Sequence, residues 1–212
     1  MKTLKRRIFL RYALSFPAIT TLFSCVRQRK DLGNIQANNL IKDDKAMELS
    51  KAMTKDQVFA MLDQRVQLTM EKSNNCAQTA FFALSQQFGL GGDDVLKALT
   101  PLPGIAERGE TCGAVTGALM AMGLMYGRDR MDDWQKYRDS LIPTNLFCKE
   151  FECEVGSTLC CEIQQKTFGE SYDLMDASDL KAFQRAGATQ KCGVIVKKAC
   201  RFAAEIILTH KV

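Results

Sequence analysis

The amino-acid sequence predicts an all-α domain, a single compact helical bundle of about five to seven helices. Apolar residues recur at helical spacing along most of the chain, and no segment shows the sustained alternation that is typical of a half-buried strand. The chain also has only 4 prolines among its 212 residues. That length suffices for one ordinary hydrophobic core but not for two.

Capping residues and terminating residues predict the bounds of the first helices of the bundle. A capping box formed by Thr54 and Gln57 opens a helix over 54–70. A second helix is expected over 75–88, because an asparagine begins it and a glycine follows it. Two aspartates open a short third helix over 93–101, which a proline ends.

The middle of the chain is expected to contain a loop followed by two helices. Two prolines and two glycines within 101–110 predict the loop. Thr111 is expected to cap a helix over 111–126, which a glycine terminates. The next helix is expected over 132–153, with a break before Pro143.

The two ends of the chain are less regular. A short turn is expected after Ser157, then an irregular stretch over 166–178 and a final helix over 191–209. Near the N-terminus, residues 26–45 are polar and lack apolar periodicity. They indicate a tether in front of a cysteine-rich helical domain over 46–212.

Residues 1–25 resemble an export signal. Their basic start is followed by an apolar stretch over 12–23 that is too short to span a bilayer. Arg6 and Arg7 open a segment that resembles the twin-arginine export motif, and the residues ending at Cys25 resemble a lipobox, whose cysteine becomes lipidated. These resemblances imply an exported protein on the periplasmic or cell-envelope side, held at the membrane by a lipid anchor. Twin-arginine export carries folded proteins, which favours a cofactor inserted before export.

Charge and histidine content argue against two classes of function. The formal net charge of +5 arises from five basic residues within 1–25, and the rest of the chain has 24 basic and 24 acidic residues. Without residues 1–25 the chain has no net positive charge to attract phosphate groups, which argues against nucleic-acid binding. The one histidine, His210, lies third from the end, which argues against a Ser-His-Asp or Cys-His relay. Any chemistry is therefore expected at sulfur.

Four of the nine cysteines lie in predicted first helical turns. These are Cys76, Cys112, Cys160 and Cys192. The free amides and the positive dipole end of a helix N-terminus lower the pKa of a thiol and stabilise its anion. Four cysteines in such positions suggest thiolates with a shared role.

The predicted helix after Cys112 carries small residues on one stripe, at Gly113, Gly117 and Ala121, and has Gly123 in its interior as well. Each interior glycine costs about 1 kcal/mol relative to alanine. A neighbouring helix or a bulky group is therefore expected to approach this face closely.

Four stretches of the chain resemble the C_GCAxxG_C_C family, which is named for its cysteines and assigned redox activity from them. The stretches are NCAQ over 75–78, RGETCGAVTGALM over 108–120, GSTLC over 156–160, and Cys192 with Val196. The resemblance runs from about residue 70 to 208 and implies that Cys76, Cys112, Cys160 and Cys192 are the defining cysteines, with Cys161 as the alternative to Cys160. Supporting site residues around the second stretch are Arg108, Glu110, Thr111, Gly113 and Gly117. A related domain occurs in split-Soret cytochromes, but this chain has no haem motif.

Three functions fit these cysteines. The first is electron transfer to an unidentified redox partner through an iron–sulfur centre held by the four defining cysteines, which lie 36, 48 and 32 residues apart and so need a folded scaffold. The second is cofactor-free thiol–disulfide chemistry, in which Cys112 beside Arg108 attacks and Cys76 resolves. The third is a binding module stabilised by zinc or by disulfides.

Overall fold

The computed structural model describes residues 44–210 of the protein. The expected export motif at Arg6 and Arg7, the lipidation site at Cys25 and nearly all of the tether over 26–45 lie outside the described residues. Within the described range the chain forms helices and no strand, which confirms the predicted all-α fold.

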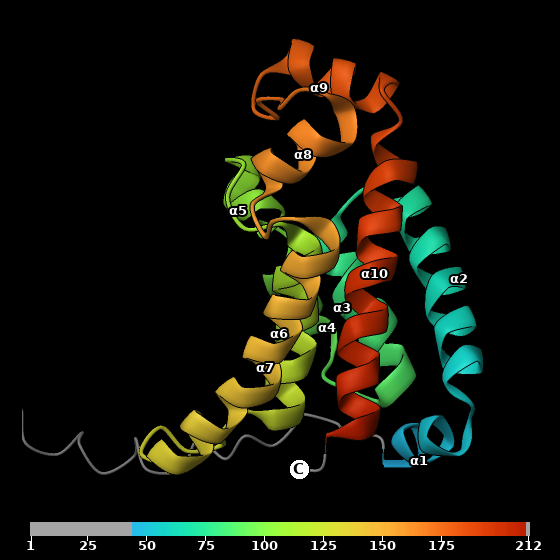
Figure 1. The fold of residues 1–212 in the computed structure, drawn as a ribbon, viewed down its shortest axis with the longest axis vertical. Helices are drawn as coiled ribbons and strands as arrows, with labels where there is room; N and C mark the ends of the chain where they lie inside the picture. The colour runs from blue at the N-terminus through green and yellow to red at the C-terminus, as the bar shows by residue number, and fades with distance from the viewer. Residues whose placement is uncertain (1–43, 211–212) are drawn as a thin grey trace, which may run out of the picture. The chain divides into compact units, whose positions relative to one another are not determined.

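Ten helical segments make up this part of the chain (Figure 1). In chain order they are α1 (Asp44–Ala52), α2 (Lys55–Ser73), α3 (Cys76–Phe88), α4 (Asp93–Ala98), α5 (Gly104–Glu107), α6 (Gly113–Tyr126), α7 (Trp134–Val155), α8 (Cys160–Phe168), α9 (Ala177–Arg185) and α10 (Ala188–Thr209). The described residues thus contain more helices than the five to seven predicted. The additional ones are short, and α1, α4, α5 and α9 bury at most one residue each. Such segments leave little periodic apolar signal in a sequence.

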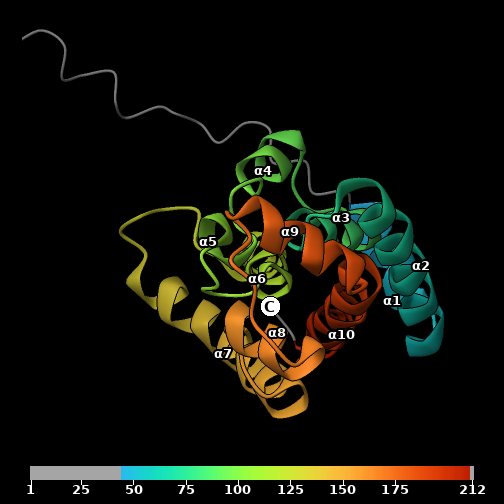
Figure 2. The same cartoon turned by 90° about the horizontal axis from the view of Figure 1, so that it is seen from above.

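Five long helices form the bundle, and Figure 2 shows them from above. Helices α3, α6 and α10 pack against one another, α2 covers α3 and α10, and α7 covers α6 and α10. Large apolar side chains fill the space between them, including Phe81, Phe88, Met122, Phe147 and Phe151, each at most 1 % exposed. Helices α3, α6 and α10 all begin at the upper end in Figure 1, where α8 and α9 lie.

The caps predicted for α2 and α3 are confirmed. Thr54 Oγ1 accepts a hydrogen bond from Gln57 N, and Gln57 Oε1 accepts one from Thr54 N. Asn75 Oδ1 accepts a hydrogen bond from Gln78 N at 2.9 Å. Local sequence therefore places Cys76 as the first residue of α3.

Two helices in the middle of the chain differ from the prediction. Cys112, not Thr111, is the N-cap of α6, because Thr111 forms an isolated antiparallel bridge with Leu159. Helix α7 runs unbroken through Pro143, where a break was expected. A proline inside a helix costs about 3 kcal/mol. Burial of Pro143 and of the apolar side chains that follow it in α7 offsets this cost.

The last third of the chain is more helical than predicted. The turn expected after Ser157 extends into α8, the irregular stretch is confined to 169–176, and α9 follows it. Helix α10 begins at Ala188 rather than near residue 191, so Cys192 lies in its second turn. The connection depends on Gly187, whose φ of 84° reverses the chain between α9 and α10 at no steric cost.

The expected close approach to the small residues of α6 is made by α3. A Cβ atom on Gly117 would lie 2.2 Å from Ala77 O, and one on Gly113 would lie 2.3 Å from Cys76 Sγ. Both distances are far inside van der Waals contact, so the two helices meet at a separation that only glycine permits. Gly123 plays no such part, because a Cβ atom there would meet nothing within 4 Å.

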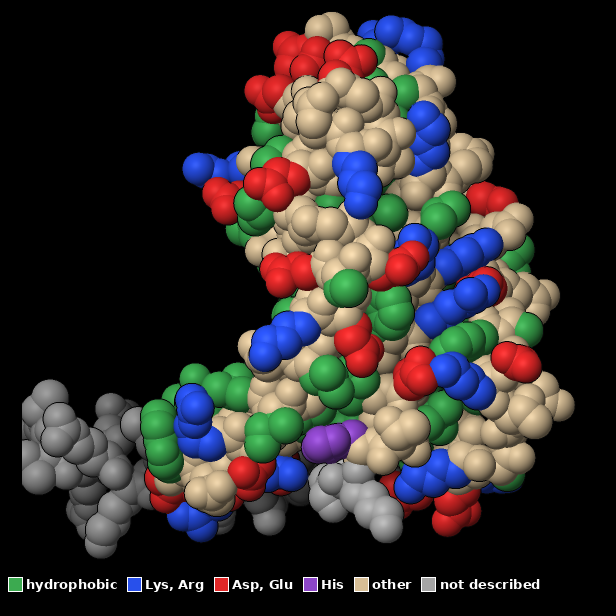
Figure 3. Space-filling view, in the orientation of Figure 1, with side chains coloured by type: hydrophobic (Ala, Val, Ile, Leu, Met, Phe, Trp, Pro, Cys, Tyr) green, Lys and Arg blue, Asp and Glu red, His purple; other side chains and the backbone are tan. Residues whose placement is uncertain are grey.

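The surface carries interspersed charges on the face shown in Figure 3. Three ion pairs join α10 to α2 and α7, and these are Lys55–Glu205, Asp63–Arg201 and Glu154–Lys198. Each pair is partly exposed to solvent and contributes at most about 1 kcal/mol. Among the described helices, none has both the length and the apolar character needed to cross a bilayer.

Gly117→Ala is expected to destabilise the protein by about 1–3 kcal/mol, because the added methyl group overlaps a carbonyl oxygen of α3. Gly123→Ala is the matched control on the same helix and is expected to stabilise the protein by up to about 1 kcal/mol through helix propensity. Urea unfolding followed by circular dichroism measures both changes. Equal stabilities of the two variants would contradict the close packing of α3 on α6.

Candidate functional site

Four cysteines from four helices line one small cavity at the end of the bundle where α3, α6 and α10 begin. Cys76 is the first residue of α3, Cys112 is the N-cap of α6, Cys160 is the first residue of α8, and Cys192 lies in the second turn of α10. The cavity has a volume of about 30 Å³, which is room for about one water molecule. The fold thus brings together the four cysteines that the sequence indicated.

Cys76 and Cys112 meet across the contact between α3 and α6. The sulfur of Cys76 lies over Gly113, where any side chain would occupy its position. Cys76 and Cys112 both line the cavity, and interaction with Cys76 raises the pKa of the Cys112 thiol. The glycine at the start of α6 therefore serves the cysteine pair as well as the helix packing.

A short antiparallel pairing holds the start of α8 beside the start of α6. Cys112 N donates a hydrogen bond to Thr158 O at 2.8 Å, and Cys160 N donates one to Glu110 O at 2.6 Å. The two bonds flank the isolated bridge formed by residues 111 and 159. They bring Cys112 and Cys160 together although 48 residues separate them in the sequence.

The segment in front of Cys112 has an unusual backbone conformation. Gly104, Ile105, Ala106 and Glu107 all have φ values between 50° and 60°, so α5 is a turn in the left-handed region. This region costs about 1–2 kcal/mol for each residue with a side chain, and surrounding contacts must hold it. One such contact is with Cys160, whose Cβ would lie 3.5 Å from a Cβ on Gly104. The sequence predicted only a loop here, because a single glycine does not reveal a four-residue left-handed turn.

Two supporting residues expected near Cys112 lie in solvent instead. Arg108 and Glu110 are exposed, and within residues 44–210 their side chains form no hydrogen bond or ion pair. Cys112 itself is only 6 % exposed. This differs from the expected arrangement, in which Arg108 would support a thiolate at Cys112. Thr111 contributes through its backbone, as part of the bridge that joins α6 to α8.

The structure distinguishes Cys160 from its neighbour Cys161. Cys160 lines the cavity, whereas Cys161 does not. Cys161 packs against Gly109, where a Cβ atom would lie 3.1 Å from Cys161 Cβ, and its amide donates a hydrogen bond to Gly109 O. Of these two adjacent cysteines, Cys160 occupies the position expected of the family cysteine.

The remaining described cysteines lie elsewhere. Cys148 and Cys153 are on α7, the first half-buried and the second exposed. Cys200 is fully buried in α10, and its thiol donates a long hydrogen bond of 3.7 Å to Ala80 O. Burial raises the pKa of Cys148 and of Cys200. All eight cysteines within the described range are free thiols in this structure.

Three thiols of the cavity, those of Cys112, Cys160 and Cys192, have raised pKa values, which favour their neutral form. A hydrogen bond with Cys76, then burial and the charge of Cys76, raise the pKa of Cys112 well above its usual value, and the amides at the start of α6 do not outweigh them. Burial, followed by the charge of Cys112, raises the pKa of Cys160 and of Cys192 to about 12. Helix N-termini were expected to lower these pKa values. Burial reverses that effect, because the water that would stabilise an anion is excluded.

The donor set has the chemistry of a soft metal site. Thiolate ligands favour zinc, copper(I) and iron–sulfur clusters. No Lys, Arg or His is among the residues that line the cavity, so no side chain there offsets the charge of thiolates. Across the part of the chain that the structure describes, however, no three His, Cys, Asp or Glu side chains are arranged to hold a single metal ion.

A second cavity adjoins the first. It has a volume of about 100 Å³ and shares Cys76, Cys160 and Cys192 with the smaller one. Apolar side chains from the loop after α8 and from α9, including Leu174 and Phe183, form much of its opposite wall. This loop and α9 therefore cover the cysteines on the outer side.

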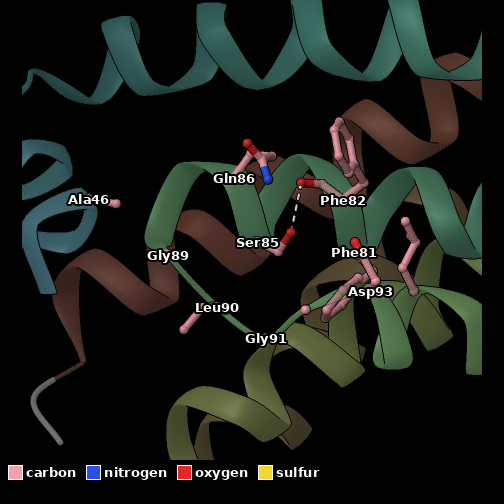
Figure 4. A pocket seen from close by; sticks show the side chains of 11 residues that line it. Ala46, Phe81, Phe82, Ser85, Gln86, Gly89, Leu90, Gly91 and Asp93 are labelled. Carbon is pink, nitrogen blue, oxygen red and sulfur yellow. Dashed lines mark hydrogen bonds between the residues drawn. The ribbon is translucent and has the colours of Figure 1, made fainter. Parts of the chain in front are cut away.

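Two of the larger cavities lie beside α3 and α4, separate from this site. The one shown in Figure 4 has a volume of about 260 Å³ and is lined by residues of α1, α3, α4 and the loop between α3 and α4. Another of about 400 Å³ lies between α2, α3 and α4. Neither is lined by a cysteine, so neither is part of the thiol site.

Gln164 is a residue of the site that the sequence did not indicate. It lines the cysteine cavity, is 2 % exposed, and its Nε2 donates a hydrogen bond to Cys160 Sγ at 3.5 Å. The two residues are one helical turn apart on α8. This spacing carries meaning only once α8 is known to be a helix, and the sequence predicted a short turn there.

One family model matches the chain. The model, described as "Putative redox-active protein (C_GCAxxG_C_C)", matches residues 74–206, which is more than half of the chain. The matched range begins just before Cys76 and ends after Cys192, so it includes all four cavity cysteines. No curated protein and no solved structure matches the chain.

At pH 8, iodoacetamide is expected to modify Cys153 of the native, metal-free protein at least about tenfold faster than the cavity cysteines Cys112, Cys160 and Cys192. Cys153 is exposed, whereas Cys112 is buried, Cys160 and Cys192 are half-buried, and all three are protonated because their pKa values are raised. The difference should persist at pH 10, which is still below the raised values of about 12. Peptide mass spectrometry after brief labelling measures the rates, and labelling in denaturant should remove the difference. Equal rates in the native protein would contradict the buried site.

Proposed function

Because the chain belongs to the C_GCAxxG_C_C family of putative redox-active proteins, we propose that it transfers electrons through a cysteine-ligated iron–sulfur centre. The proposed ligands are the clustered residues Cys76, Cys112, Cys160 and Cys192. One observation carries the proposal: four thiols from four helices line a single buried cavity. When bound, such a centre accepts and releases electrons at a potential that the protein sets.

The balance of charge supports metal ligation. Repulsion from Cys112 contributes to the raised pKa of Cys160 and of Cys192, after burial, which contributes most. Four buried thiolates would repel one another strongly without a counter-charge, and the cavity wall has no cationic side chain. Metal cations would offset this repulsion, and cysteine ligands are deprotonated on binding. The site is thus unfavourable for bare thiolates and suited to metal-bound ones.

We propose a polynuclear centre in place of one zinc ion. Ligands of a cluster bind different metal atoms, whereas the four ligands of zinc converge on one atom at about 2.3 Å. The described residues include no three ligands arranged for one ion, yet all four cysteines share a cavity. That cavity is small, so we propose that the centre also uses the space of the adjoining cavity, which three of these cysteines border.

In this proposal the surrounding residues act through their positions. Gly113 and Gly117 allow the approach of α3 to α6 that sets Cys76 against Cys112. Gly104 allows the left-handed turn to pack on Cys160. Helix α9 and the loop before it exclude water on the outer side. Exclusion of water and hydrogen bonding to sulfur are the features by which a protein sets the potential of such a centre.

A second candidate function is dithiol–disulfide exchange between Cys76 and Cys112, and the approach of Cys76 Sγ to the start of α6 favours it. Oxidation would join the two sulfurs and release two protons and two electrons, which a disulfide substrate would accept to become two thiols. The sequence predicted that Cys112 would attack and Cys76 would resolve. Because Cys76 is half-buried and Cys112 is buried, we propose the reverse, in which Cys76 meets the substrate and Cys112 resolves.

The two candidates are separated by reconstituting the full chain anaerobically with iron and sulfide and recording the visible spectrum. We expect sulfur-to-iron charge-transfer bands and bound iron in the unaltered protein. Each of the single changes Cys76→Ser, Cys112→Ser, Cys160→Ser and Cys192→Ser is expected to remove most of the colour, because each removes a ligand. Cys161→Ser is the matched control and should keep it, since Cys161 does not line the cavity.

Other outcomes assign the site differently. A colourless protein that contains zinc would overturn the iron–sulfur proposal and support a zinc-stabilised module. A colourless, metal-free protein that forms a Cys76–Cys112 disulfide with a disulfide oxidant would support the second candidate. Loss of colour in Cys161→Ser but not in Cys160→Ser would move the site to the neighbouring residue.

We also propose that the protein is exported through a twin-arginine signal and anchored by lipid at Cys25, on the basis of residues 1–25. Changing both Arg6 and Arg7 to Lys is expected to block export, because the motif requires the arginine pair. Cell fractionation and immunoblotting measure the distribution of the protein. Cys25→Ala is expected to leave export intact and to release the protein from the membrane fraction. Normal export of the double-lysine variant would refute the twin-arginine interpretation.

A further inference from the structure

Gln164 is an uncommon kind of residue in this core. It is one of four buried polar side chains within the described residues, the others being Ser50, Thr79 and Gln87. A buried side-chain amide without hydrogen-bond partners lowers the free energy of unfolding by about 1–3 kcal/mol. Both ends of the Gln164 amide are bonded, its Nε2 to Cys160 Sγ and its Oε1 to Tyr172 N.

The bond to Tyr172 determines which end of the amide faces the sulfur. A backbone N–H is only a donor, so the atom that accepts from Tyr172 N at 2.8 Å must be the amide oxygen. The amide nitrogen therefore points to Cys160 Sγ, 3.5 Å away. The orientation follows from the hydrogen-bond network and not from an arbitrary choice between oxygen and nitrogen.

Tyr172 is itself held in place. Its ring lies 5.9 Å from that of Phe168 and 5.3 Å from that of Phe183, and these two rings lie 5.0 Å apart. The three rings join the end of α8, the loop after it and α9. The loop that covers the cysteines thus presents a fixed N–H group to Gln164.

We propose that Gln164 is a positioning residue of the cysteine centre: its locked amide holds the Cys160 sulfur toward the cavity and stabilises negative charge on it. This inference rests on the proposed redox function of the four cysteines. It assigns a role to a residue outside the cysteines and glycines that define the site. The direction of the Gln164 effect on the pKa of Cys160, which it lowers against the larger effect of burial, agrees with it.

The proposal sets the sign of the effect on the reduction potential. Reduction of a cysteine-ligated cluster places more negative charge on the sulfurs that bind it, which in this proposal include Cys160 Sγ. A donor aimed at that sulfur favours the reduced state, so its removal must lower the potential.

The test compares Gln164→Met with Gln165→Met in the full chain carrying its redox centre. Methionine has similar length and no amide, and Gln165 is exposed on the same helix, where its Nε2 bonds only Gly169 O. In Gln164→Met, the ratio of reduced to oxidised protein at the unaltered midpoint is expected to fall by about tenfold, the effect of one hydrogen bond to a charged acceptor. This is about 59 mV toward lower potential for a one-electron centre. Gln165→Met should leave the potential unchanged.

A second measurement separates this proposal from the proposed function. Hydrogen exchange followed by nuclear magnetic resonance on the metal-free protein should show the Gln164 side-chain amide exchanging at least about tenfold more slowly than that of Gln165. The backbone amide of Tyr172 should lose protection in Gln164→Met. If the chain takes up no redox centre, the proposed function fails, and these exchange rates still decide whether Gln164 is locked. A Gln164→Met protein that loses Tyr172 protection but keeps its potential would show a structural role only and overturn the proposal, as would equal exchange of the two glutamine amides.

Discussion

The contact between α3 and α6 is the constraint on which the rest of the structure depends. It exists because Gly113 and Gly117 have no side chains where Cys76 Sγ and Ala77 O approach. The same contact lies at the centre of the bundle, between α2, α7 and α10. A single backbone requirement therefore serves both core packing and the meeting of the first two cysteines. Glycines that weaken a helix by propensity are retained here because they allow a separation that no other residue permits.

The second half of the site is attached to the first by backbone hydrogen bonds. The pairing of residues 110–112 with 158–160 sets Cys160 beside Cys112 without any side-chain contribution. The left-handed turn over 104–107 then packs against Cys160 from the other side. Such strain is stable only where surrounding structure compensates for it, and here it lies next to the buried thiols.

Burial and helix position act in opposite directions on these thiols. Amides at a helix start favour a thiolate, but exclusion of water favours the neutral thiol. The raised pKa values of Cys160 and Cys192, for which burial is the largest cause, show that burial prevails. The same features become favourable once positive charge occupies the site, because helix amides and the Gln164 donor both point toward sulfur. A site with four clustered thiol donors that is unfavourable for bare thiolates accords with the redox activity ascribed to the family.

Local sequence was sufficient wherever a short-range interaction decides the structure. The capping box at Thr54 and the cap at Asn75 place α2 and α3, and the helical spacing of apolar residues predicts the all-α class. The sequence also singled out Cys76, Cys112, Cys160 and Cys192 as the cysteines of the site. Long-range interactions decided the remainder. The bridge between residues 111 and 159 shifted the cap of α6 to Cys112, and packing against α6 and α10 carried α7 through Pro143.

The site itself shows the same division. Sequence spacing could not choose between Cys160 and Cys161. Adjacent side chains point to different faces only after the helix has formed, and the start of α8 is held by hydrogen bonds to residues about 50 positions earlier. Nor could it reveal Gln164, whose role requires a loop amide from one side and a sulfur from the other. Burial raises the pKa of these thiols, and burial is a property of the assembled bundle. Side chains from other helices exclude water from the cysteines.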